Sequence, residues 1–409
     1  MLSTVFARLF GRPEPDAPDD PAPSLPAHGG GGTAVSMTGG GARAAYQAGV
    51  LRGVARVAPD FRPDLLTGVS AGGLNAAFLA ASAQRPFADA VEHLVDLWHA
   101  LRADQVYRLD RPSVAGTVAR LVRRPATVEP PGEGGLLDTS PLYAFVSEHL
   151  GPIGEPVGAI GDAVAAGALR ALALTATSYR TGEAVTWVQS RDVPARPGRR
   201  YAYTPVRPEH VLASAALPFF FPAVRVDSPG GEAGWFGDGG IRLTAPLSPA
   251  LRLGADRILS INTRAAGATA HDDGPGYPPT SRVLGTLMNA VFLDVLDRDA
   301  QTLRRINALL AATPPAQWGG FRPVDLLVIR PSVDLAELAS GYEPVLPPSM
   351  RVAVGGIGRR DSSGDAAASP DWLSMLLFDT DYVSRLVALG EADVAARADE
   401  VRAFLAPRV

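Results

Sequence analysis

The chain has 409 residues, of which 46% are hydrophobic and 20% are charged, and its formal net charge is −4. This balance excludes a typical nucleic-acid-binding protein, whose surface is strongly basic. All 38 basic residues are arginine, so a phosphate-binding loop that ends in Gly-Lys-Ser/Thr is excluded. Cysteine is absent as well, which excludes disulfides, thiolate metal sites and a cysteine nucleophile.

Residues 1–32 are expected to form a disordered tail and linker, because residues 11–32 are rich in Pro, Asp and Gly and offer little to bury. Residues 1–12 could form a short helix that docks on a membrane surface, or could be a frayed terminus. We find no secretory signal and no run of about 18 apolar residues. The expected location is therefore cytoplasmic, with peripheral membrane association as a further option.

Strands and helices are predicted to alternate from residue 33 onward. Apolar runs predict strands over 33–38 and 65–69, followed by helices that end near Val57 and Ser82. Short turns between such elements are typical of a parallel sheet that is covered on both faces. We therefore expect an α/β fold, a three-layer αβα sandwich around a mostly parallel central sheet. Further helices are predicted over 87–101, 210–216, 284–311 and most of 372–405, and further strands over 170–178, 184–189, 257–262 and 324–330.

These elements divide the chain into three parts: the tail 1–32, a main domain over 33–265, and a mostly helical C-terminal extension over 266–409 that packs on the main domain. Residues 351–369 are rich in Gly, Ser and Asp, and we interpret them as either a lid or a surface loop.

Ser70 stands in the pentapeptide Gly68-Val69-Ser70-Ala71-Gly72, where a predicted apolar strand meets a predicted helix of small residues. This is the setting of a nucleophile elbow, in which a strained turn exposes the serine hydroxyl. Side chains at Gly68 and Gly72 would collide with neighbouring backbone in such a turn. The alternative is a serine that merely caps the following helix.

The run Gly39-Gly40-Gly41-Ala42-Arg43 follows the first predicted strand and opens its helix. Acyl transfer needs N–H donors aimed at the oxygen of the tetrahedral intermediate, and a glycine-rich turn can present them. We therefore predict an oxyanion hole here, with the Arg43 charge either orienting the loop or holding a phosphate.

Two other glycine patterns compete with this interpretation. Gly39-x-Gly41-x-x-Ala44 also satisfies the dinucleotide-binding fingerprint, but the next strand ends in Ser70 rather than in the acid which that fingerprint requires. His28-Gly29-Gly30-Gly31 resembles the oxyanion loop of lipases, but it precedes the first core strand, so we interpret it as linker.

Asp238 lies in Trp235-Phe236-Gly237-Asp238-Gly239-Gly240, after large apolar residues rather than in a polar loop. An ordinary Asp-Gly turn is the competing interpretation. A Ser-His-Asp triad would need a histidine, and in hydrolase chain order only His271 follows Asp238, in a segment that looks like a solvated loop. A Ser70–Asp238 dyad is more economical, because a carboxylate can accept the serine proton directly.

Together these pieces resemble the patatin-like phospholipase family, whose pattern is a Gly-Gly-Gly-x-Arg loop, a Gly-x-Ser-x-Gly elbow and an Asp-Gly-Gly/Ala motif in that order. The segments 135–142 (Gly-Leu-Leu-Asp-Thr-Ser-Pro-Leu) and 213–222 (Ala-Ser-Ala-Ala-Leu-Pro-Phe-Phe-Phe-Pro) are also similar to the family. The resemblance is good over residues 33–262 and looser over 281–409. It implies that Ser70 is the nucleophile, Asp238 the base and the backbone of Gly39–Gly41 the oxyanion hole.

The resemblance also implies a lipid or fatty-acyl ester substrate and no metal or cofactor. The residues that we expect to contact the substrate are Phe219, Phe220, Phe221 and Trp235. Two other functions remain open: a non-catalytic lipid-binding regulatory protein, and a thioesterase or acyltransferase with the same dyad. Head-group preference and oligomeric state are not fixed by these motifs.

Overall fold

The computed structural model describes residues 31–108, 135, 137–194, 198, 200–218, 220–227, 234–265, 286, 295–342 and 370–407. The expectations for the N-terminal tail, for His271 and for a lid or loop over 351–369 concern residues outside these ranges. None of the described helices is long and apolar enough to cross a membrane.

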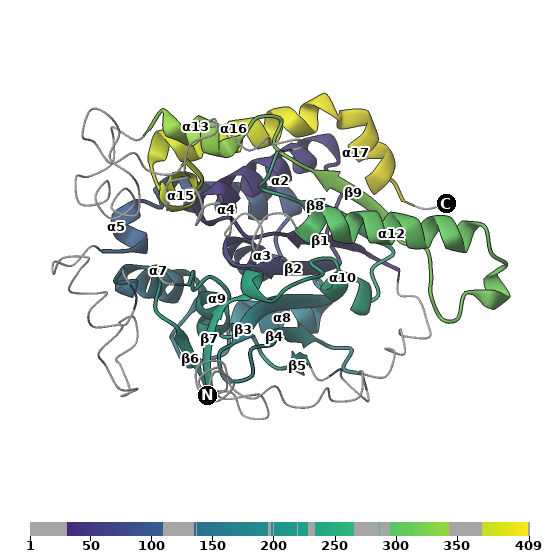
Figure 1. Ribbon diagram of the computed structural model, residues 1–409, viewed down its shortest axis with the longest axis horizontal. Helices are drawn as coiled ribbons and strands as arrows, with labels where there is room; N and C mark the ends of the chain where they lie inside the picture. Colours follow the sequence, from purple (N-terminus) through teal and green to yellow (C-terminus); the bar gives the residue numbers. More distant parts are fainter. Residues whose placement is uncertain are drawn as a thin grey trace, which may run out of the picture.

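A mostly parallel sheet forms the centre of the molecule (Figure 1). Five strands run parallel in the order β3-β2-β1-β8-β9: β3 (Ala171–Ser178), β2 (Leu65–Val69), β1 (Thr33–Met37), β8 (Arg257–Ile261) and β9 (Asp325–Ile329). Every residue of β1, β2 and β3 is buried, as expected for parallel strands covered on both faces. The predicted strands over these five segments agree with the structure to within one residue at each end.

Antiparallel pairing enters at the β3 side of the sheet. β4 (Ala184–Ser190) runs antiparallel to β3 and pairs with the short β5 (Tyr201–Tyr203). β7 (Gly234–Asp238) also runs antiparallel to β3, beyond the end of β2, and pairs with β6 (Val224–Val226). β5, β6 and β7 are too short and irregular in pattern to have been predicted from the sequence.

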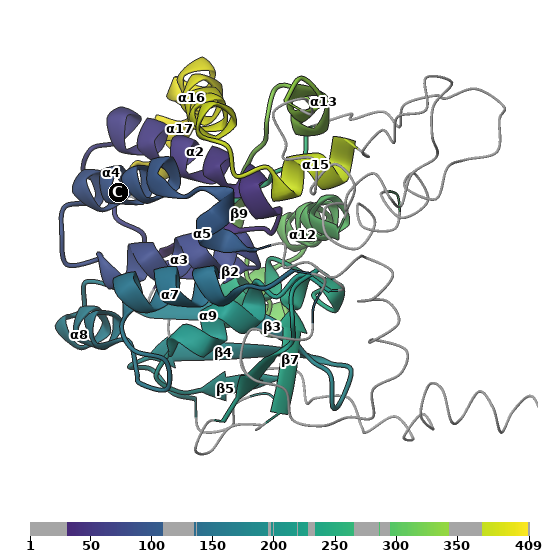
Figure 2. The same ribbon diagram turned by 90° about the vertical axis from the view of Figure 1, so that its left-hand side faces the viewer.

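Helices cover both faces of the sheet, so the predicted three-layer αβα architecture is confirmed (Figure 2). Alternate strand residues face opposite layers: Leu66 belongs to the larger core and Leu65 to the smaller one. The larger layer contains α2 (Ala45–Val57), α3 (Ala71–Ala81), α4 (Phe87–Ala100), α8 (Gly158–Ala166) and α9 (Pro208–Ser214). The smaller layer contains α10 (Ser248–Arg252) and α12 (Val295–Ala311).

The C-terminal residues are built into this body. β9 extends the central sheet, and α16 (Thr380–Ala396) packs on α2 through glycines. A Cβ at Gly49 would overlap the backbone of Val387, and one at Gly390 would overlap the carbonyl of Tyr46. Glycine is thus required where the two helix backbones approach each other. The remaining described helices are η1 (Gly41–Ala44), α5 (Ala103–Val106), α7 (Ser140–Leu150), η2 (Gly239–Ile241), η3 (Pro315–Gln317), α13 (Leu335–Ser340), α15 (Pro370–Leu376) and α17 (Ala398–Leu405).

Candidate active site

Ser70 occupies a strained turn between β2 and α3. Its backbone has φ 57° and ψ −135°, and it is the one non-glycine residue with positive φ in the described part of the chain. Such a conformation costs on the order of 1–3 kcal/mol. A Cβ at Gly68 would overlap the carbonyl of Gly72, and one at Gly72 would overlap the carbonyls of Met37 and Thr38. The Ser70 side chain makes no capping hydrogen bond to α3, so the geometry is that of a nucleophile elbow rather than of an N-cap.

A buried serine that the sequence motifs do not single out anchors this elbow. The N–H of Ser70 donates to Oγ of Ser214, at 3.0 Å, and that hydroxyl donates to the carbonyl of Thr175, at 2.6 Å. Ser214 lies at the end of α9, and Thr175 lies on β3. The strained turn is therefore tied to the strand beside it.

The pairing of β3 brings Asp238 next to Ser70. Thr175 of β3 is opposite Val69, the last residue of β2, and the next residue, Ala176, is opposite Asp238. β4 pairs along one edge of β3. Along the other edge, β2 pairs with β3 up to Val69, and β7 pairs with β3 beyond that point, next to Ser70. Thr177 Oγ1 also donates to the Asp238 carbonyl, at 2.8 Å, and so fixes the end of β7. Ser70 and Asp238, which are 168 positions apart in the sequence, are thus brought together beside residues 175–176 of β3.

The Asp238 carboxylate is completely buried. Burial raises its pKa to about 7, while the Ser70 hydroxyl and the Gly240 N–H oppose this rise by stabilising the charged form. Oδ1 accepts the Gly240 N–H at 2.8 Å. Oδ2 has no well-directed hydrogen-bond partner among the described residues and is therefore available to accept a proton. Catalytic hydrogen bonds commonly tighten only when substrate binds.

The glycine loop lies against Ser70. A Cβ at Gly39 would stand 2.8 Å from the Ser70 Cβ, and Gly40 and Gly41 have φ values of 149° and 56° that favour glycine. Thr263 Oγ1, after β8, donates to the Gly39 carbonyl at 2.7 Å and fixes the loop from the other side. The N–H groups of Gly40 and Gly41 make no hydrogen bond within the described ranges, as donors reserved for an oxyanion would.

The side chains at the end of this loop are buried and have structural partners. Ala42 is fully buried. Arg43 is 2% exposed, and its guanidinium binds Ser374 Oγ at 2.7 Å and the Asp371 carboxylate at 3.1 Å. Both partners belong to α15, so the Arg43 charge orients the loop, and it has no free face for a phosphate.

The dinucleotide interpretation of the same glycines does not fit this arrangement. Asp64, which directly precedes the second strand, accepts the Thr33 N–H at 2.7 Å and therefore lies at the amino end of the sheet. A ribose-binding acid is required at the carboxyl end of that strand, where Ser70 stands.

None of the described histidines lines the Ser70 pocket. His210 stacks on Trp187 with 4.4 Å between ring centroids, its Nδ1 accepts the Arg207 N–H, and burial lowers its pKa to about 3. His149 pairs with the carbonyl of Phe145 at 2.9 Å. The described part of the chain therefore offers no histidine in the Ser70 pocket.

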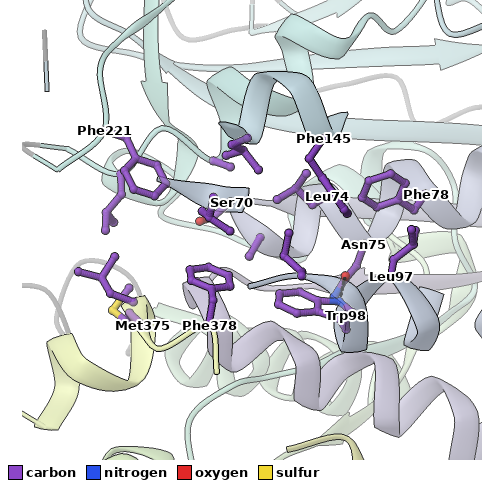
Figure 3. Close-up of a pocket in the computed structure, with 18 of the residues that line it drawn as sticks. Ser70, Leu74, Asn75, Phe78, Leu97, Trp98, Phe145, Phe221, Met375 and Phe378 are labelled. Atoms are coloured by element: carbon purple, nitrogen blue, oxygen red, sulfur yellow. Dashed lines mark hydrogen bonds between the residues drawn. The ribbon is translucent and has the colours of Figure 1, made fainter. Parts of the chain in front are cut away.

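An apolar pocket opens beside Ser70 (Figure 3). One side of α3 supplies Ala71, Leu74, Asn75 and Phe78 to its wall. The other lining residues are Gly41, Leu94, Leu97, Trp98, Leu101, Val106, Leu142, Phe145, Ala215, Leu217, Phe221, Met375, Leu376 and Phe378. Figure 3 places Ser70 between Phe221 and Met375 at one end and Phe78 and Leu97 at the other.

Asn75 is the one amide in this wall, and its polar atoms are already satisfied. Its Nδ2 donates to the Ala44 carbonyl at 3.1 Å and to Gln47 Oε1 at 2.9 Å. Its Oδ1 accepts from Trp98 Nε1 at 2.8 Å. Beyond Ser70, therefore, the pocket presents a hydrocarbon surface, because a satisfied amide does not demand a polar ligand.

Of the three predicted substrate contacts that the structure describes, Phe221 lines the pocket, and Phe220 and Trp235 do not. Phe220 is buried against Trp372, with 4.5 Å between ring centroids, and Trp235 is exposed on β7. Phe219 lies outside the described residues. Most of the wall, including Phe78, Leu97 and Phe145, comes from helices. In the sequence, these apolar residues cannot be distinguished from residues of the hydrophobic core.

Known structures resemble this chain at low identity. It is similar to VipD from Legionella pneumophila, with 12% identity and a TM-score of 0.39 over 90% of this chain and 67% of VipD. It is also similar to human GIVD cytosolic phospholipase A2, with 12% identity and a TM-score of 0.42 over 91% of this chain and 60% of the human chain. The human protein in complex with methyl gamma-linolenyl fluorophosphonate gives 15% identity, a TM-score of 0.40, and coverage of 92% and 59%. The chain thus spans about three fifths of the human chain, and a search of curated proteins gave no match.

The model of one protein family, described as patatin-like phospholipase, matches residues 35–251. This range is more than half of the 409 residues and contains the glycine loop, Ser70 and Asp238. The expected resemblance is confirmed: the chain belongs to the patatin-like phospholipase family.

Proposed function

We propose that this protein is a serine acyl hydrolase that cleaves lipid esters with a Ser70–Asp238 dyad. Membership of the patatin-like phospholipase family supports hydrolysis of lipid acyl groups as the general activity. The observation that carries the specific proposal is the position of Ser70, at an apolar pocket and beside a buried carboxylate with a raised pKa.

In the first half-reaction, Asp238 Oδ2 accepts the Ser70 proton while Oγ forms a bond to the ester carbonyl carbon. The resulting oxyanion accepts hydrogen bonds from the N–H groups of Gly40 and Gly41, which are stronger in the transition state than in the substrate. The bond between carbon and the leaving oxygen then breaks, and Asp238 returns the proton to that oxygen. This step releases the alcohol or lysolipid and leaves an acyl-enzyme.

Water completes the cycle by attacking the acyl-enzyme carbonyl. Asp238 takes the proton from this water, the Ser70–acyl bond breaks, and the proton passes to Ser70 Oγ. A base with a pKa of about 7 suits both half-reactions, because a substantial fraction of it is deprotonated at neutral pH and it still holds a proton well enough to transfer it.

The apolar wall supports a fatty-acyl group as the part of the substrate that is held. Nearly all lining residues are aliphatic or aromatic, and Asn75 has no polar atom left to satisfy. Burial of each methylene of an acyl chain contributes about 0.8 kcal/mol. The head group is left outside this pocket, which is consistent with selection for acyl chains rather than for head groups.

The test combines labelling with hydrolysis. A fluorophosphonate probe should label wild-type protein at Ser70 and should fail to label Ser70→Ala. Phospholipid, lysophospholipid, triglyceride and acyl-thioester substrates should then be hydrolysed by wild type, with a loss of at least about 10⁴-fold in Ser70→Ala. Absence of labelling in a folded wild type would favour the lipid-binding alternative. Preference for the thioester, or transfer to an added alcohol, would favour the thioesterase or acyltransferase.

A further inference from the structure

The segment from α15 to Phe378 lies outside residues 35–251, yet it forms part of the active site. Met375, Leu376 and Phe378 line the same pocket as Ser70. Figure 3 shows Met375 and Phe378 at the end of the pocket opposite Phe78. The C-terminal part of the chain therefore contributes walls to a site whose reacting groups all come from the family-matched part.

The same segment holds the glycine loop by a charged contact. Ser374 is completely buried, and its hydroxyl accepts from Arg43 Nε at 2.7 Å while donating to the Asp371 carbonyl at 2.7 Å. A terminal nitrogen of the Arg43 guanidinium donates to the Asp371 carbonyl at 3.3 Å and to its carboxylate at 3.1 Å. Among the described residues, the hydrogen-bond and ion-pair partners of the Arg43 side chain are all on α15. Directional bonds from a planar guanidinium fix orientation as well as distance.

Backbone packing brings α15 against the proposed donors themselves. A Cβ at Gly41 would overlap the carbonyl oxygen of Met375, so the loop and α15 meet without intervening side chains. Gly41 also has φ 56°, and it is one of the two residues whose N–H we assign to the oxyanion hole. A shift of α15 would therefore move the Gly41 amide directly.

The far end of the segment is tied to the main domain. Tyr107 donates its hydroxyl to the Leu376 carbonyl at 2.7 Å, and the Ala103 N–H donates to the Phe378 carbonyl at 3.1 Å. Both partners are buried or nearly so, and neither belongs to the catalytic set. α15 is thus held at one end by Arg43 and at the other by the region around α5.

From these contacts we infer that Asp371 and Ser374 are positioning residues, which act through Arg43 to hold the Gly40 and Gly41 amides in the geometry that the oxyanion needs. The inference rests on the proposed function of the loop as an oxyanion hole. Neither residue lines the Ser70 pocket, so their effect is expected on the transition state rather than on substrate binding. Oxyanion-hole donors are worth about 10²–10³-fold in kcat, and a displaced donor loses part of this amount.

The test uses Ser374→Ala, Asp371→Asn and the conservative Asp371→Glu in the full chain, with Asp381→Asn as a matched control. Asp381 is an exposed carboxylate on the next helix that makes no contact with Arg43. On a short-chain ester we expect kcat to fall about tenfold in the first two variants with KM within twofold, and to recover in Asp371→Glu. Hydrogen exchange over residues 39–43 should be faster in the same two variants and unchanged in Asp381→Asn.

Wild-type kcat in both variants, or unchanged exchange over 39–43, would overturn the inference. Ser374→Ala removes one hydroxyl and leaves the ion pair, so it remains informative if Asp371→Asn folds poorly. Failure of the proposed function would be seen differently, as a wild type that neither labels nor hydrolyses any substrate. In that case hydrogen exchange alone would decide whether α15 holds the loop, and unchanged exchange would still overturn the inference.

Discussion

The two ends of the Ser70 pocket are built on opposite principles. At the proposed catalytic end, Ser70 has a strained backbone, Asp238 is a buried carboxyl group, and the Gly40 and Gly41 amides have no partner among the described residues. At the far end, Phe78 packs edge-on against Phe145, and the one amide has all its polar atoms satisfied. The features of the catalytic end lower the folding stability, whereas the packing at the apolar end raises it. Substitutions at the catalytic end should therefore lower activity while raising stability, and substitutions at the apolar end should lower stability and change substrate selectivity together.

The largest effect is expected for Asp238→Asn, which keeps the shape of the side chain and removes its basicity. Activity should fall about 10³-fold or more, because no described histidine can replace the base. Stability should rise at pH 8 by on the order of 2 kcal/mol, since an amide can be buried without ionising. Kinetics and urea unfolding measure the two effects, and full activity would contradict the dyad and favour a His271 triad.

The stability gain has a defined pH dependence. The folded Asp238 carboxyl keeps its proton up to a pKa of about 7, whereas the unfolded chain releases it near 3.8. Between these values the native state binds more protons, so wild-type stability falls as pH rises. The advantage of Asp238→Asn should therefore be absent near pH 4, grow as pH rises to about 7 and stay constant above that, whereas Asp381→Asn should show no such trend.

The wild-type activity should follow the same carboxyl. If Asp238 must be deprotonated to act, kcat/KM should fall about tenfold for each pH unit below about 7, or about 100-fold at pH 5. A pH series with a soluble ester and a check of folding at each pH measures this midpoint. A flat profile between pH 5 and 8 would mean that another group accepts the Ser70 proton.

At the apolar end, Phe78→Ala should change both stability and selectivity. Phe78 lies about two helical turns from Ser70, ~12 Å along α3, and ends the pocket there. Removing its ring should cost about 3 kcal/mol and should raise the preference for long over short acyl esters roughly tenfold.

The matched control for this variant is Phe61→Ala. Phe61 packs edge-on against Phe87 in the same core and does not line the pocket. Its loss should lower stability by a similar amount without changing chain-length preference. Equal selectivity in the two variants would show that Phe78 does not limit the acyl chain.

The smallest effects are expected for Phe221 and Trp235, which the sequence analysis both placed in contact with the substrate. Phe221 lines the pocket, so Phe221→Ala should raise KM several-fold for acyl esters. Trp235 is exposed on β7, so Trp235→Ala should change kcat/KM by less than about twofold and stability by less than about 0.5 kcal/mol. A larger loss in Trp235→Ala would restore the original expectation that it contacts the substrate.

Much of the fold follows from local pattern. Continuous apolar runs predicted β1, β2 and β8, because strands buried on both faces are apolar throughout, and an apolar stripe at helical spacing predicted α2. Trp235 to Asp238 left no such trace, since a short strand with glycines lacks alternation. Most of the pocket wall was likewise hidden, because an apolar residue beside a cavity has the same sequence signature as one in the core.

The sequence by itself determined the proposed reacting groups, because the Ser70 elbow and the glycine loop are local motifs: Gly68 is required by its contact with Gly72, and Gly40 and Gly41 are favoured by positive φ. Only the tertiary structure decided how these groups meet. Asp238 lies beside Ser70 because β7 pairs with β3 directly beyond the point where β2 ends. This register joins segments that are 168 residues apart in the sequence. Arg43 received its partners from α15 in the same way. Such contacts depend on long-range packing, and no spacing within the chain encodes them.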